Sequence, residues 1–147
     1  MEFKRLAAML IVAAGVVAGC SAQAPAETAS VPGGQPGGGE QVSDEGGVTV
    51  KVTWAGPDSG ASFDVAMDTH SVDLDGLDLR DAILRNDRGD QLSAEPWTAP
   101  TGGHHRAGTL TFGGDVRSVL DRASWIEVVV RDVAGVPERV LRWQVGA

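Results

Sequence analysis

The chain of 147 residues contains one cysteine, no tyrosine and few basic residues. The lone Cys20 excludes a disulfide within the chain and any zinc or iron–sulfur site that needs several thiolate ligands. With 12 Lys and Arg against 20 Asp and Glu, the formal net charge is −8. A nucleic-acid-binding surface needs clustered basic residues, so this balance argues against nucleic acid as a partner. It also argues against binding of the domain to anionic lipid head groups.

Long apolar runs are also scarce, and the one substantial run covers residues 6–20, directly after Lys4 and Arg5. A basic start, an apolar stretch and a small-residue exit are typical of a secretory signal peptide. The run is too short for a comfortable membrane span, and nothing later is long and uncharged enough to be one. We therefore predict that the chain is exported from the cytoplasm.

The exit of this run, Val17-Ala18-Gly19-Cys20, resembles the lipobox of bacterial lipoprotein precursors. That resemblance implies cleavage before Cys20 and lipidation of its thiol and new amino group, with palmitate among the expected acyl chains. Several acyl chains would hold the protein firmly at the cell membrane, facing outside the cytoplasm. The membrane is then a partner through the lipid anchor.

The segment after Cys20 is rich in Gly and Pro and contains the run PGGQPGGG at residues 32–39. Its apolar surface is too small to offset the entropy lost on ordering, and Gly-rich chain is flexible. We predict a signal peptide over residues 1–19, a lipidated Cys and disordered tether over 20–47, and one folded domain over 48–147. A domain of this size has a single modest core.

Alternation of apolar and polar residues predicts strands in the remaining chain, most clearly over residues 48–54, where Val and Trp alternate with Thr and Lys. Further strands are predicted over 63–67, 77–84, 106–112, 125–131 and 140–145, with an irregular or edge strand within 91–100 and a helical turn within 115–123. About seven short strands joined by Gly, Pro and Asp turns favour an antiparallel β-sandwich, and a small open barrel is the alternative.

Residues 119–130, a short helical turn that runs into a strand, resemble the late corner of immunoglobulin-like and fibronectin-like domains. The resemblance implies an all-β, immunoglobulin-like antiparallel sandwich. Those domains often carry a tyrosine at this corner, and this chain has none.

The three histidines, His70, His104 and His105, all fall in expected loops. Imidazole is the commonest metal ligand and carboxylates are natural co-ligands, so Asp68 and Asp73 beside His70 could complete a site for zinc or copper(II). The loops at one end of a sandwich gather, which would bring His70 near the other two. The other interpretation is that these histidines are solvated, or bond to Asp68 or Asp73 and hold the loops together.

The run Asp68, Asp73, Asp75, Asp78 and Asp81 offers oxygen ligands for calcium, but its spacing differs from the EF-hand loop. Solvated strand ends and turn caps are the other interpretation.

No catalytic set stands out in the sequence, which has neither a phosphate-binding Gly loop nor a nucleophile with an evident base. We therefore predict a non-enzymatic binding or accessory module that recognises an envelope protein or another envelope component through its end loops. A metal-binding domain that uses the loop histidines is the alternative. Among the tryptophans, Trp97 is expected to be the most exposed, because Pro96 precedes it in an irregular segment.

Overall fold

The computed structural model describes residues 37–145, so the predicted signal peptide, Cys20 and most of the predicted tether lie outside the described residues. The elements are β1 (Gly39–Glu45), β2 (Val48–Trp54), a 3-10 turn η1 (Pro57–Ser59), β3 (Ser62–Thr69), β4 (Ile83–Asn86), β5 (Gln91–Ala94), β6 (His105–Gly113), α1 (Val116–Leu120), β7 (Trp125–Val133) and β8 (Val136–Gln144). Neither helix in this range has the length and apolar character needed to cross a membrane.

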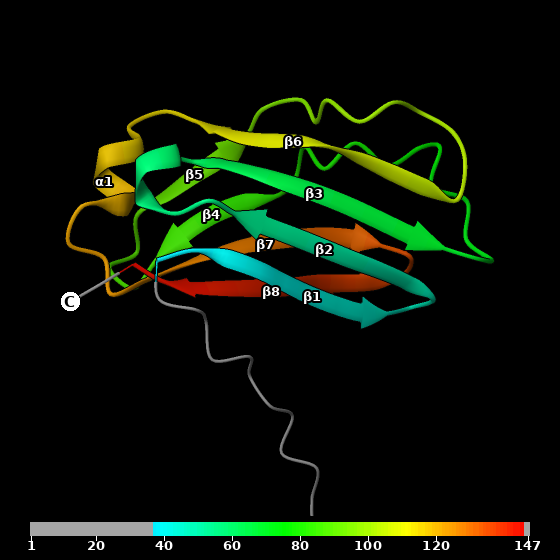
Figure 1. Cartoon of the computed structure of the whole chain (residues 1–147), viewed down its shortest axis with the longest axis horizontal. Helices are drawn as coiled ribbons and strands as arrows, with labels where there is room; N and C mark the ends of the chain where they lie inside the picture. Colours follow the sequence, from blue (N-terminus) through cyan, green and yellow to red (C-terminus); the bar gives the residue numbers. More distant parts are fainter. Residues whose placement is uncertain (1–36, 146–147) are drawn as a thin grey trace, which may run out of the picture.

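The eight strands form one antiparallel sheet in the order β1-β2-β3-β6-β5-β4-β7-β8. Only two residue pairs join β5 to β6, Ser93 with Gly113 and Ala94 with Phe112, so the sheet bends there into two four-stranded parts. The parts face each other, and the outermost strands β1 and β8 lie side by side (Figure 1). The prediction of an antiparallel all-β domain is confirmed, and the sheet comes close to the barrel that was the alternative.

Side chains close the seam between β1 and β8. Trp143 Nε1 donates a hydrogen bond to the Gly39 carbonyl at 2.8 Å. The guanidinium of Arg139, which is buried, donates to the carbonyls of Ser43 at 3.3 Å and Glu45 at 2.8 Å. An open strand edge invites pairing with another chain, and these bonds occupy the β1 carbonyls that would otherwise do so.

The core lies between the two parts of the sheet, and the alternation of β2 supplies one wall of it. Val48, Val50 and Val52 point inward and are fully buried, as the period of two predicts. Four aromatic rings fill one end of the core, with centroids between 5.4 and 6.3 Å apart, from Trp54, Phe63, Phe112 and Trp143.

The folded domain begins earlier than predicted, because β1 occupies residues that the sequence assigned to the disordered tether. This strand offers little apolar surface: Gln41 faces inward, and Val42 points outward and is 45% exposed. Its stability comes from the full backbone ladder with β2 and from the side-chain donors of β8. Amino-acid composition alone cannot predict such hydrogen bonds, so the strand was missed.

The strand predicted over 77–84 is displaced. It runs over Ile83–Asn86 instead, and residues 77–82 form a loop in which Leu79 is buried and has φ 54°. The predicted edge strand is the four-residue β5, which lies inside the sheet order. Trp97 was predicted to be exposed and is 8% exposed, because it packs beneath Arg106.

Candidate binding site at the loop end of the sheet

Two long loops meet at one end of the sheet, residues 70–82 after β3 and residues 95–104 before β6. The strands β3 and β6 pair antiparallel, with Asp68 opposite His105, so the end of one lies beside the start of the other. We call this region, residues 70–82 and 95–104, the loop end. It carries His70, His104 and most of the acidic residues singled out above.

Arg106 joins the two loops of the loop end. The side chain points inward from β6 and the residue is 4% exposed. Its guanidinium donates to the carbonyls of Leu74 and Leu77 in the first loop, both at 2.6 Å, and of Pro100 in the second loop at 2.8 Å. It also lies 4.7 Å from the centroid of the Trp97 ring, a cation–π contact. One buried cation therefore fixes the path of both loops.

The second loop also packs directly on β6. An added Cβ at Gly108 would lie 2.4 Å from the Ala99 backbone nitrogen, so only glycine allows this approach. Thr98 extends the contact, because its Oγ1 accepts from the Thr109 N–H at 2.8 Å. The loop before β6 is thus held by backbone contact as well as by Arg106.

Thr69, the last residue of β3, turns the first loop. Its Oγ1 accepts from the N–H groups of Ser71 and Val72 and donates to the Gly47 carbonyl at 2.8 Å. Its own N–H donates to the His104 carbonyl at 2.9 Å. These bonds bring the start of the first loop beside the end of the second.

An open cavity of about 430 Å³ lies between the loops. It is lined by His70, Ser71, Val72, Asp73, Asp75, Gly103 and His104. The structure thus brings His70 and His104, two of the three loop histidines, to one cavity. Asp73 is also present, and its Oδ1 accepts from the Asp75 N–H at 2.9 Å.

His105 and Asp68 lie apart from this cavity, on the outer face of β6 and β3. His105 Nδ1 is 2.5 Å from Asp68 Oδ1, and Lys51 Nζ is 3.5 Å from Asp68 Oδ2. The hydrogen bond to His105, together with Lys51, holds the pKa of the Asp68 carboxyl below its ordinary value of 3.8. His104 belongs to the loop and lines the cavity, whereas His105 is the first residue of β6 and bonds to Asp68 on its outer face.

The five predicted ligands, His70, His104, His105, Asp68 and Asp73, thus do not form one cluster. Within residues 37–145, no group of three or more His, Cys, Asp or Glu side chains is placed to hold a metal ion. Two acidic residues of the first loop serve turns: Asp78 Oδ1 accepts from the Arg80 N–H at 3.2 Å, as Asp73 does within its own turn. Turn capping, the second interpretation offered above, describes these two.

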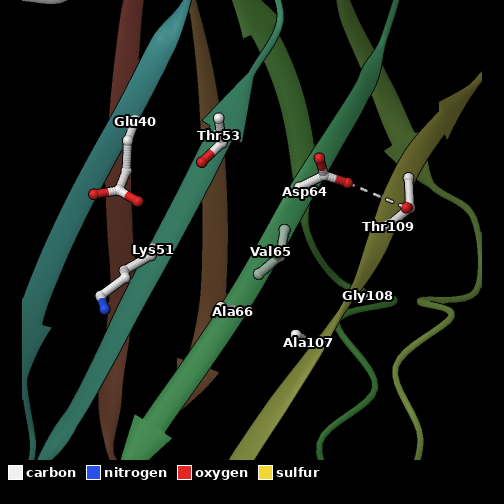
Figure 2. A pocket seen from close by; sticks show the side chains of 9 residues that line it. All are labelled: Glu40, Lys51, Thr53, Asp64, Val65, Ala66, Ala107, Gly108 and Thr109. Atoms are coloured by element: carbon white, nitrogen blue, oxygen red, sulfur yellow. Dashed lines mark hydrogen bonds between the residues drawn. The ribbon is translucent and has the colours of Figure 1, made fainter.

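A second hollow, which the sequence reasoning missed, lies on the outer face of β1, β2, β3 and β6 (Figure 2). Its volume is about 350 Å³, and its floor is low because Ala66 and Ala107 are small. Its charged lining residues are Glu40, Asp64 and Lys51. Lys51 Nζ lies 3.5 Å from Asp68 Oδ2, and Asp64 Oδ1 accepts from Thr109 Oγ1 at 3.3 Å. We call it the acidic hollow. Its members come from four strands, so only the register between the strands reveals it.

Comparison with protein-family models, curated proteins and solved structures finds no match to this chain.

Proposed function

We propose that this chain is the precursor of a lipid-anchored lipoprotein whose domain acts outside the cytoplasm as a non-enzymatic binding module. The observation that carries the binding role is the bridge that Arg106 makes between two exposed, polar loops. Loops that recognise a partner bind better when their conformation is fixed beforehand, because less entropy is lost on binding.

An immunoglobulin-like arrangement of the domain is part of this proposal. The ladder order β2-β3-β6 on one side and β5-β4-β7-β8 on the other corresponds to strands A-B-E and C′-C-F-G of that fold, with β1 added outside. The helix α1, between β6 and β7, falls where the chain crosses from strand E to strand F. In such domains, recognition commonly uses loops at one end of the sheets.

The direction of the strands supports a binding site that faces away from the anchor. Gly39, where β1 begins, pairs with Trp54, whereas Thr69 at the loop end pairs with Val48 at the opposite end of β2. A tether from Cys20 would therefore reach the domain at the end remote from the loop end. The intervening chain can span at most about 60 Å when fully extended.

Three measurements test this proposal. The Cys20→Ala variant is expected to leave the membrane fraction, and the wild-type protein to carry acyl groups on Cys20 by mass spectrometry. A photo-crosslinking amino acid at Asp75 should then give one discrete adduct in intact cells, and the same group at Asp58, in η1 at the other end, should give none. Equal adducts at both positions, or none at either, contradict a binding role for the loop end.

A metal-binding domain is the second candidate function, favoured by one observation: His70 and His104 line the same cavity as Asp73. Two imidazoles and a carboxylate are suitable ligands for zinc or copper(II) once the loops adjust around an ion. Calorimetric titration with each ion should show stoichiometric binding that His70→Ala abolishes. His105→Ala is the matched control and should leave binding unchanged, because His105 lies outside the cavity. Absence of stoichiometric binding refutes this candidate.

A further inference from the structure

The outer face of β4, β7 and β8 carries two arginines held by one buried carboxylate. The side chain of Glu127 is 3% exposed. It accepts from Arg85 Nε at its Oε2 and from Arg142 Nε at its Oε1, both at 2.7 Å. The three residues stand directly opposite one another in the ladders, as a row across the sheet. Charge-assisted bonds to a shared acid fix both guanidinium groups in place.

This row has a surplus of positive charge in a strongly acidic chain. Two guanidinium groups share one carboxylate, whereas three other arginines each have a carboxylate of their own: Arg80 pairs with Asp78, Arg88 with Asp90 and Arg131 with Glu138. Arg142 also lies 4.1 Å from the centroid of the Trp125 ring. We call Arg85, Trp125, Glu127 and Arg142 the arginine face. Tryptophan and arginine are the residues most enriched at binding hot spots.

The acidic hollow has the opposite surplus, because the lysine that lines it, Lys51, is paired with Asp68 outside the hollow. Glu40, Thr53 and Asp64 stand opposite one another on β1, β2 and β3 as a row across the sheet (Figure 2). Neither Glu40 nor Asp64 forms an ion pair with another residue of the described range. The small floor of the hollow leaves room for long side chains from outside.

The two rows match in spacing. Arg85 and Arg142 are separated by one intervening strand, and so are Glu40 and Asp64. Since neighbouring strands lie about 4.8 Å apart, each pair spans about 10 Å. Two sheet faces packed together can therefore place both arginines over both acids.

The outer ends of the neighbouring rows also match. Next to the arginines runs an apolar row that ends in Val140, which is 44% exposed. Next to the acids runs the row Val42, Lys51 and Ala66, in which Val42 is 45% exposed and Lys51 Nζ lies 3.5 Å from Asp68 Oδ2. These two valines are the large apolar residues that the described surface leaves most exposed, and this packing would cover both.

We propose that the arginine face of one copy docks on the acidic hollow of a second copy of this chain. The two surfaces lie on different parts of the sheet, so the contact is head to tail, and it repeats into rows or rings. A weak contact in solution becomes effective when copies share one membrane, because the anchor raises their local concentration. That last step rests on the proposed lipid anchor, whereas the contact itself does not.

Sedimentation velocity of residues 21–147, which contain the whole folded domain, tests the contact. The protein concentration is varied from about 10 µM to about 1 mM, the range of dissociation constants of weak complexes. We expect an average mass that rises beyond the monomer with concentration. The double variant Glu40→Lys/Asp64→Lys should weaken association at least about tenfold, because it replaces attraction by like-charge repulsion. Both positions are exposed, so the fold should persist, which a thermal melt checks.

The matched control is Asp58→Lys/Asp121→Lys, which changes net charge equally but lies outside the acidic hollow. Association that persists in the control and is lost in the hollow variant supports the docking. A monomer at every concentration, or equal effects of both double variants, refutes it and leaves a partner of another kind for the arginine face. Neither outcome bears on the crosslinking at Asp75, so the binding role of the loop end stands or falls separately.

Discussion

Replacement of Arg106 tests whether the loop end is held by one buried cation. Arg106→Met keeps the stem of the side chain and removes the donors to four carbonyls, those of Leu74, Leu77, Ala99 and Pro100. Each buried carbonyl left without a donor costs about 1–3 kcal/mol, and the desolvation cost of the guanidinium is recovered in part. We expect a loss of about 2–4 kcal/mol from the free energy of unfolding, a large share of the usual 5–15 kcal/mol.

Urea unfolding of wild type and variant measures this loss, and native-state hydrogen exchange shows where it falls. We expect faster exchange in residues 70–82 and 95–104 with little change in β7 and β8. Arg117→Met is the matched control, because Arg117 is exposed on α1 and should change stability by less than about 0.5 kcal/mol. A loss below about 1 kcal/mol for Arg106→Met, or uniform exchange across the sheet, refutes the reasoning.

Three further predictions concern single contacts. Gly108→Ala should lower the unfolding free energy by about 1–3 kcal/mol in urea titrations, because the new Cβ meets the Ala99 backbone; an unchanged midpoint contradicts that contact. NMR titration should find the pKa of Asp68 below 3.8 and higher in His105→Ala. Because folding lowers this pKa, its contribution to stability is present above pH 3.8, is lost as the pH falls through the folded value, and shrinks in the variant. Glu127→Gln should lower the free energy of unfolding by about 1–3 kcal/mol, since two guanidinium groups lose their shared anion. A melting temperature equal to that of wild type would contradict this and show that water replaces the carboxylate.

The sequence predicted the strands whose two faces differ most, and it missed those held by polar contacts. The alternation in β2 is explicit because one face is fully buried and the other meets water. β1 has no such pattern, since its bonds come from the β2 backbone and from Arg139. Leu79 was assigned to a strand because it is apolar, yet it lies in a loop, where its side chain is buried.

The positions of the histidines at the candidate site could be predicted from the sequence, but the residues that hold the loops in place could not. Loops at one end of a sheet gather, so the approach of His70 to His104 followed from topology alone. The start of β6 at His105 separates that residue from His104, which stays in the loop. The role of Arg106 depends on the path of loops distant in sequence, and that of Glu127 depends on strand register. Neither leaves a local pattern in the chain.

The opposite placement of the β1 entry point and the loop end has a mechanical consequence. An anchor that pulls at Gly39 and a partner that holds the loop end would load the domain along its strands. Force in that direction shears the ladder between β1 and β2, so its hydrogen bonds resist together and do not open one by one. The bonds from Arg139 and Trp143 to β1 add to that resistance from the other side. With the proposed anchor at one end and the proposed partner at the other, the domain would transmit tension along its strands.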